Sequence, residues 1–147
     1  MTTINLKKIE EDYKKASSHI EKRIVICAGT GCIANGSLLV HEAFKKALAD
    51  AGLELFVDVK LNYHDDEKTY QLTGSGCQGF CAQGPLVNIL PDEILYTKVK
   101  PEDVEEILDK TVLKGEIIER LLYVNPADGK KSKGQTEIPF YKRQTRM

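Results

Sequence analysis

The sequence contains no tryptophan, no long apolar run and almost no net charge, the formal value being −1. Its longest apolar runs, near residues 23–28 and 86–90, are far shorter than the roughly 20 residues that span a bilayer. The first residues have no apolar core of the kind that marks a secretory signal. Nucleic-acid binding normally requires a basic face, which this charge balance does not support. These absences predict a cytoplasmic protein that binds neither membrane nor nucleic acid.

The composition is otherwise that of an ordinary folded domain. The chain has 147 residues, of which 41% are apolar and 29% are charged. This length is enough to bury one hydrophobic core, so we expect a single main domain. In a reducing compartment, paired cysteines more often bind metal or carry out redox chemistry than form structural disulfides.

Hydrophobic spacing predicts the elements of the first third of the chain. Residues 5–20 have the spacing of an amphipathic helix, and the β-branched run at residues 23–27 predicts a buried strand. Residues 28–36 are rich in glycine and predict a loop. Ser37 is the expected N-cap of a second helix, which Gly52 ends.

The remainder of the chain predicts a second strand, a hairpin and another helix. The second strand is expected at residues 53–59, and residues 70–73 form either a short strand or an irregular segment. Residues 86–90 and 94–99 predict an antiparallel hairpin around a turn. Pro101 stands at a favourable first position of the following helix.

This order of elements predicts an α/β fold of the thioredoxin-like type. A β-α-β unit and an antiparallel hairpin form a small mixed sheet flanked by helices, with an extra N-terminal helix. We expect the N-terminal helix in residues 1–21, the main domain in residues 22–124 and a polar, lysine-rich linker in residues 125–147. The aromatic end of that linker must pack on this domain, on a partner or on a further domain.

The four cysteines form two pairs, each in a glycine-rich stretch. Cys27 and Cys32 have a Cys-x4-Cys spacing, and Cys77 and Cys81 have a Cys-x3-Cys spacing. The first strand–helix junction and the entry to the hairpin are expected at one end of the sheet. The two pairs should therefore meet in space although they are about 50 residues apart in sequence.

Three kinds of site are compatible with these pairs. Structural zinc usually uses tighter spacings, and a thioredoxin-type redox pair requires Cys-x-x-Cys, although Cys27 and Cys32 could form a disulfide. Four thiolates are the ligand number of an iron–sulfur cluster, and glycine-rich loops supply backbone N–H groups to its sulfur atoms. Two separated pairs suit a [2Fe–2S] cluster, with one pair on each iron. Spacing favours the cluster and leaves zinc and redox thiols as alternatives.

A second pattern overlaps the first cysteine pair. Residues 29–34 satisfy Gly-x-Gly-x-x-Gly/Ala after a strand, which is the turn of dinucleotide-binding folds, and Asp58 could then be the ribose-binding acid. Asp58 comes somewhat later than the usual ~20 residues. The pattern also places Cys32 inside the phosphate loop and leaves the other cysteines unexplained. We therefore interpret these glycines as part of a metal site.

The cysteine motifs resemble those of a known family. Cys27-x4-Cys32 after the first strand and Cys77-x3-Cys81 before Ala-x-Gly-Pro resemble the thioredoxin-like [2Fe–2S] ferredoxin domains. Such domains occur in the small flavoprotein subunit of respiratory complex I, in related hydrogenase and formate dehydrogenase subunits, and as free dimeric ferredoxins. This variant looks most like the N-terminal domain of the large diaphorase subunit of multisubunit, often electron-bifurcating, iron-only hydrogenases. The resemblance covers residues 23–144.

The resemblance implies a one-electron relay rather than an enzyme. It implies a [2Fe–2S] cluster whose ligands are Cys27, Cys32, Cys77 and Cys81. The partners would be flavin- and iron–sulfur-carrying subunits or domains of a hydrogenase or NADH dehydrogenase-type complex, with a homodimer as an alternative. The parent polypeptide would be a subunit of an NAD(P)H-dependent oxidoreductase. Residues 125–147 would connect this excised domain to an absent flavin-binding body.

The remaining noteworthy residues have simpler interpretations. His19, His41 and His64 have no second ligand at metal spacing, so we expect surface or partly buried histidines. Phe80 is expected to pack or to anchor its loop, where it would also keep water from a cluster. Pro85 could follow a cis peptide bond that shapes its loop, although a trans bond is the general tendency.

Overall fold

The computed structural model describes residues 4–53, 55–56 and 69–144. Most of the predicted second strand, together with Asp58 and His64, lies outside these residues. Of the helices in the described part, none combines the length and the apolar content needed to cross a bilayer.

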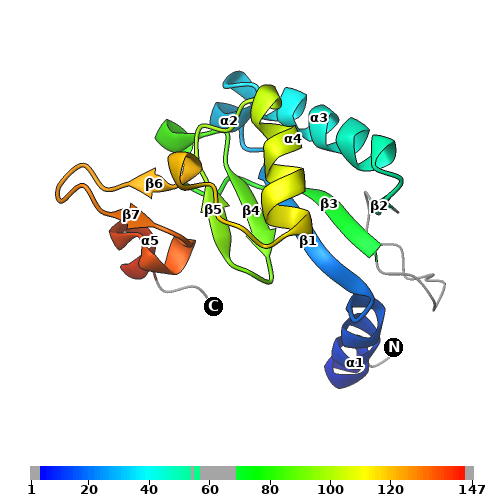
Figure 1. Cartoon of the computed structure of the whole chain (residues 1–147). Coiled ribbons are helices and arrows are strands. Elements are labelled where there is room, and N and C mark those ends of the chain that lie inside the picture. The colour runs from blue at the N-terminus through cyan, green and yellow to red at the C-terminus, as the bar shows by residue number, and fades with distance from the viewer. Residues whose placement is uncertain (1–3, 54, 57–68, 145–147) are drawn as a thin grey trace.

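A five-stranded mixed sheet forms the centre of the molecule (Figure 1). Its strands are β1 (Ile20–Cys27), β2 (Leu55–Phe56), β3 (Thr69–Ser75), β4 (Val87–Leu90) and β5 (Ile94–Tyr96), in the order β2-β3-β1-β4-β5. β3 is parallel to both β1 and β2, whereas β4 is antiparallel to both β1 and β5. The predicted hairpin is therefore confirmed. Residues 70–73, for which the sequence left a short strand and an irregular segment open, belong to strand β3. In the sheet, β3 lies between β1 and β2.

Helix α3 (Ser37–Asp50) follows the short helix α2 (Thr30–Ala34), which lies within the stretch predicted to be a loop. The prediction of a loop was wrong there because residues 30–34 complete one helical turn, with the Ile33 N–H donating to the Gly29 carbonyl at 2.9 Å. Ser37 is not the N-cap either. Gly36 takes that position with φ +94°, a conformation that a side chain disfavours, and Ser37 begins the helix.

The C-terminal helix of the main domain begins at proline as predicted. A 3-10 turn at Pro101–Asp103 leads into α4 (Val104–Glu106), which continues as the π-helical segment Ile107–Leu113. A further 3-10 turn follows at Glu119–Leu121.

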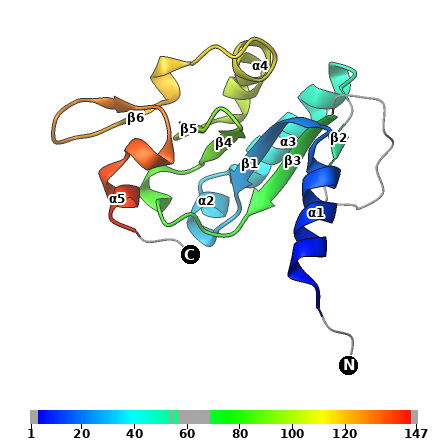
Figure 2. The ribbon, with the colours of Figure 1, turned by 90° about the horizontal axis from the view of Figure 1, so that it is seen from below.

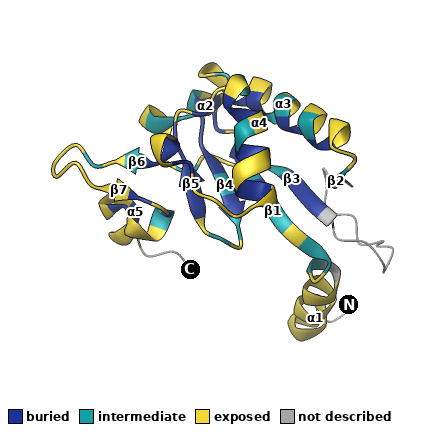
Figure 3. Cartoon of the chain, viewed as in Figure 1, coloured by how far each residue is buried: buried dark blue, intermediate teal, exposed yellow. Residues whose placement is uncertain are grey.

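The main core lies between one face of the sheet and the helices α3 and α4. Ile24 and Ile26 of β1 and Leu72 of β3 are buried on that face. Phe44 of α3 and Ile107, just after α4, contact the same apolar cluster, and both are fully buried. Figure 3 shows this buried face in dark blue between the strands and the two helices.

Helix α1 (Leu6–Ser17) is present as predicted but extends away from the sheet (Figure 1 and Figure 2). Its apolar residues Leu6, Ile9 and Tyr13 are 75%, 55% and 43% exposed. The amphipathic pattern therefore predicted the helix correctly, while the described part of the chain leaves its apolar side largely uncovered.

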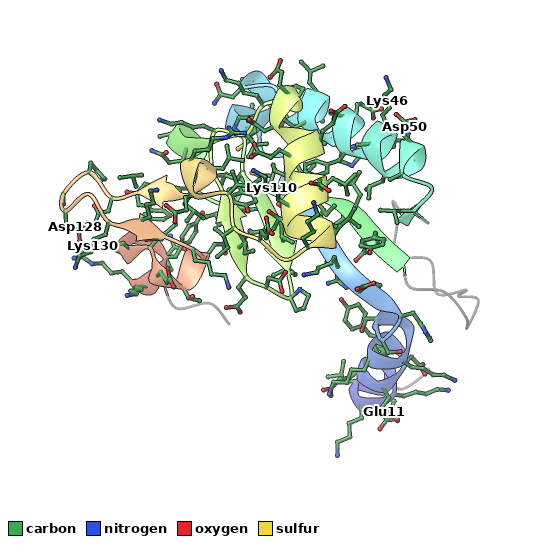
Figure 4. All side chains as sticks on the ribbon, in the orientation of Figure 1. Glu11, Lys46, Asp50, Lys110, Asp128 and Lys130 are labelled. Carbon is green, nitrogen blue, oxygen red and sulfur yellow. The ribbon has the colours of Figure 1, made fainter. Side chains whose placement is uncertain are left out.

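The C-terminal segment folds back onto the main domain. Strands β6 (Tyr123–Val124) and β7 (Lys131–Ser132) form a small hairpin, with Asp128 and Lys130 at its exposed tip (Figure 4). A 3-10 turn and helix α5 (Pro139–Lys142) follow. Among the three alternatives for the aromatic end of the chain, the structure shows packing on this domain, because Ile138 and Tyr141 are buried in it.

Replacing Phe44 tests the main core. Phe44→Ala should lower the free energy of unfolding by about 3–5 kcal/mol, since it removes a buried ring and leaves a cavity. Leu39→Ala, on the same helix but 66% exposed, is the control and should change stability by less than about 0.5 kcal/mol. Urea unfolding followed by far-ultraviolet circular dichroism measures both, and equal midpoints would contradict this account of the core.

Candidate metal centre

The first cysteine pair lies at the carboxyl end of the central strand. Cys27 is the last residue of β1, and Cys32 lies in α2 directly after it. The backbone N–H of Cys27 donates to the Leu86 carbonyl at 3.0 Å, which continues the pairing of β1 with β4 beyond its regular ladder. Both side chains are buried, with exposed fractions of 1% and 0%.

The second cysteine pair lies in the loop that follows β3. Cys77 comes two residues after the strand, and Cys81 begins the 3-10 helix Cys81–Gln83. Both cysteines are exposed, and their Sγ atoms are 3.6 Å apart. The Gly79 N–H donates to the Sγ atom of Cys77 at 3.3 Å, so a backbone donor already points at this sulfur. Hydrogen bonds of this kind stabilise thiolate ligands and tune a bound metal group.

Parallel pairing brings the two pairs together. In the parallel register, Cys27 at the end of β1 pairs with Ser75 at the end of β3. The loops that follow these two strands therefore leave the sheet at the same edge. The Ala28 N–H donates to the Ser75 carbonyl at 2.9 Å and keeps the first turns of both loops adjacent. The two cysteine loops therefore lie side by side in the structure, as the sequence predicted.

Glycines allow the loops to touch. A Cβ atom added to Gly29 would lie 2.9 Å from the Cα atom of Cys77, and one added to Gly31 would lie 2.9 Å from the Cβ atom of Cys81. At Gly84, an added Cβ atom would lie 2.5 Å from the Sγ atom of Cys32. These distances are too short for any side chain. The three glycines, two in the first loop and one after the second, thus form a cradle that a methyl group would fill.

This contact also explains the apparent dinucleotide fingerprint. Gly29 and Gly31 are the first two glycines of that pattern, but the space beside them holds Cys77 and Cys81. The helix that follows has only five residues. The glycines therefore allow close packing of the two cysteine loops.

The four thiols influence one another electrostatically. Burial raises the pKa of Cys32 to about 12, with further increases from a hydrogen bond to Cys27 and from the Cys27 charge. The pKa of Cys81 is raised first by its hydrogen bond to Cys77 and by the charge of that neighbour, and to a lesser extent by Cys27. Without a cation, therefore, the buried thiol of Cys32 keeps its proton at neutral pH. A metal that binds here must displace that proton.

The residues present fit a group with two metal ions. All four cysteines are free thiols, and they form an inner buried pair and an outer exposed pair. Among the described residues, no three His, Cys, Asp or Glu side chains surround a single ion position. A [2Fe–2S] cluster would take four thiolates, which is the number that the cysteines of this chain supply.

Other predicted features have mixed outcomes. His19 and His41 are both partly buried, as expected, and the Nδ1 atom of His41 lies 3.9 Å from a carboxylate oxygen of Glu42. The peptide bond between Gly84 and Pro85 is cis, which is the alternative that the sequence left open and not the general tendency. Phe80 is partly buried and packs with the cysteine-containing apolar cluster, in agreement with its predicted packing role.

Comparison with known proteins assigns the family. Residues 12–112, more than half of the chain, match the family model of the thioredoxin-like [2Fe–2S] ferredoxins. The chain belongs to this family. The predicted thioredoxin-like α/β fold and the [2Fe–2S] cluster as cofactor are thereby confirmed, and the chain carries electrons through that cluster. Ferredoxins are electron carriers rather than enzymes, as expected for this chain.

Individual ferredoxins agree with this assignment. A [2Fe–2S] ferredoxin of Aquifex aeolicus is 36% identical over 91 residues, which cover 62% of this chain and 71% of the relative. One from Clostridium pasteurianum is 35% identical over 69 residues, covering 47% and 67%. The solved structure of a thioredoxin-like [2Fe–2S] ferredoxin from Aquifex aeolicus has a TM-score of 0.55 and 32% identity, covering 69% of this chain and 89% of that chain.

Two glycine-to-alanine substitutions test whether cluster binding requires the close contact between the two cysteine loops. Gly29→Ala should lower the cluster content of the purified protein, because its Cβ atom would push on the backbone of Cys77; overpacking of this kind costs about 1–3 kcal/mol. Gly76→Ala is the matched control, since an added Cβ atom there has no neighbour within 4 Å. Visible absorbance and iron per chain measure the effect, and equal cluster content in both variants would contradict the cradle.

Proposed function

We propose that Cys27, Cys32, Cys77 and Cys81 are the ligands of the [2Fe–2S] cluster. The observation that carries this proposal is the contact between the two cysteine loops, in which glycines lie where side chains would separate the pairs. Four thiolates are the ligand set that such a cluster requires. The four described cysteines are free, and no other residue type is needed to complete the set.

When bound, the cluster supplies a centre that gains and loses one electron. The residues of the chain hold it and control its surroundings. Cys27 and Cys32 are enclosed by the protein, which restricts water on the inner side, whereas Cys77 and Cys81 are exposed. Another carrier can therefore approach closely on the side of the outer pair. Solvent exposure and hydrogen bonds to sulfur both tune the reduction potential.

We further propose that the relay serves a larger NAD(P)-linked complex. The variant of the cysteine motifs and the C-terminal segment resemble the diaphorase subunit of multisubunit hydrogenases, in which the domain would exchange electrons with a flavin or another iron–sulfur centre in the cytoplasm. Residues 125–147 would then lead toward a flavin-binding body. A homodimer, as in free ferredoxins of this family, is the alternative assembly.

The ligand assignment is tested by metal analysis and substitution. The anaerobically purified chain should contain about two irons and two sulfides and show visible bands and an EPR signal when reduced. Cys32→Ser should lose most of the cluster, because the serine hydroxyl is a poor substitute for a thiolate at this buried position. A colourless protein with one zinc per chain, or a Cys32→Ser variant with the spectrum of the unmodified protein, would overturn the assignment.

The proposed complex is tested by isolating the chain from its own cells. An affinity-tagged chain should co-purify with flavin- and iron–sulfur-containing subunits, and the preparation should show NAD(P)H- or hydrogen-dependent reduction of a dye. Cys77→Ser in the tagged chain is the control for the relay and should lower electron flow without dissolving the complex. Recovery of the tagged chain alone, or only as a homodimer, would refute the complex while leaving the electron-carrier function intact.

A further inference from the structure

The second cysteine loop receives little support from regular structure. After β3 ends at Ser75, residues 76–80 belong to no strand or helix, and the 3-10 helix begins only at Cys81. Gly79 has φ +79°, and both cysteines of the loop are exposed. Fixing the two thiolates of such a loop costs conformational entropy. Contacts with other parts of the protein that already order the loop reduce this cost.

Aromatic rings from the C-terminal segment pack against this loop. The ring of Phe80 lies 5.1 Å from Tyr123 and 5.7 Å from Tyr141, in edge-on arrangements, and stacks on Phe140 at 5.4 Å. A Cβ atom added to Gly79 would be 3.7 Å from the Phe140 ring, which places that ring directly beside the loop backbone. Aromatic pairs of this geometry stabilise by about 0.5–1.5 kcal/mol beyond the area they bury.

Polar contacts fix the same loop through Gln78. The Tyr141 hydroxyl donates to the backbone carbonyl of Gln78 at 3.1 Å. The side-chain Oε1 atom of Gln78 accepts hydrogen bonds from Asn88 at 3.1 Å and from Gln135 at 2.9 Å. Its Nε2 atom donates to the hydroxyl of Ser75 at 2.9 Å. One residue of the loop is thus tied to β3, to β4 and to the C-terminal segment.

The C-terminal segment is itself anchored. The Leu95 N–H of β5 donates to the Lys133 carbonyl at 2.8 Å, so the segment runs along the edge of the sheet. Ile138 and Tyr141 are 1% and 6% exposed and share an apolar cluster with Cys27 and Cys32. This support lies beyond residue 112, where the match to the family model ends.

We propose that residues 133–141, which we call the C-terminal brace, position the outer cysteine pair for cluster binding. Tyr141 of the brace and both Phe80 and Gln78 of the loop are the positioning residues: none is a proposed ligand, but their contacts hold the backbone that carries Cys77 and Cys81. The rings also cover one side of the loop. This inference rests on the proposed ligand assignment, and it gives part of the segment that resembles a connector a role in the metal centre.

Pre-organisation is the physical basis of this role. A loop already ordered by the brace loses less entropy when the cluster binds, so binding becomes tighter. Residues that orient metal ligands without touching the metal typically change metal affinity by roughly 10- to 100-fold when they are replaced. Phe80 and Tyr141 act at two points of the loop, through ring packing and through one hydrogen bond.

Hydroxyl deletion provides the sharpest test. Tyr141→Phe removes the hydrogen bond to Gln78 and keeps the ring, whereas Phe80→Leu removes the central ring. Tyr96→Phe is the matched control, because it deletes a buried hydroxyl that bonds Thr111 at 2.6 Å and the Ile118 N–H at 3.0 Å, in the main core. All three variants are compared as full-length, as-isolated protein.

Two readouts follow the loop and the cluster separately. Hydrogen–deuterium exchange of residues 76–81 should be about five-fold faster in Tyr141→Phe, the effect of losing one hydrogen bond, and faster still in Phe80→Leu. Loss of visible absorbance to an iron chelator should accelerate by roughly 10-fold or more in Phe80→Leu, with an altered EPR line shape. Tyr96→Phe should leave both rates as in the unmodified protein.

The outcomes distinguish the brace from the ligand assignment. Unchanged exchange of residues 76–81 in both Tyr141→Phe and Phe80→Leu, or an equal acceleration in Tyr96→Phe, would overturn the brace whatever metal the protein holds. The iron and sulfide content of the unmodified protein tests the ligand assignment independently. Faster exchange in Tyr141→Phe and Phe80→Leu, together with faster cluster loss, is the result that supports the proposal.

Discussion

The parallel pairing of β1 with β3 is the constraint on which the metal centre depends. Because Cys27 and Ser75 end their strands at the same level, two loops separated by a long stretch of chain begin side by side. Gly29 and Gly31 then let the loops approach until the backbone of one touches the cysteines of the other. Neither loop encloses the site alone. The strand pairing places the two cysteine pairs at neighbouring positions. Glycine at positions 29 and 31 has no side chain that would push the two loops apart.

The two cysteine pairs lie in unlike environments, and this difference gives the site a direction. Cys27 and Cys32 lie in an apolar cluster with Leu86 and Ile138, where burial raises the pKa of Cys32 to about 12. Cys77 and Cys81 stand at the surface on a loop without regular structure. The inner pair is held by β1 and α2 and is buried. The outer pair lies on a loop that contacts Phe140 and Tyr141, and in the proposed function it is the end that another electron carrier would approach.

Some features were predictable because their signals are local in sequence. The hairpin of β4 and β5, the helix after Pro101 and the paired cysteines all follow from residues that are close together in the chain. Local signals were insufficient for α2, where a glycine-rich stretch still completes a helical turn. They also misplaced the N-cap of α3, since Ser37 is buried within the helix and Gly36 precedes it with a positive φ. The amphipathic pattern of α1 predicted a helix but not that its apolar side is exposed.

The sequence by itself determined the likeness to a ferredoxin, with the cluster that this family binds, and the order of most of the elements, because cysteine spacing and hydrophobic period are properties of the chain. Tertiary structure alone decided which groups surround the site. The placement of β3 between β1 and β2, the fit of Gly84 against Cys32 and the packing of Phe80 with Tyr141 all join residues that no local pattern connects. Residues 125–147 predicted a linker, yet Ile138 and Tyr141 within them are buried in one apolar cluster with Cys27 and Cys32. Such contacts depend on the packing of distant segments, which periodicity and composition do not encode.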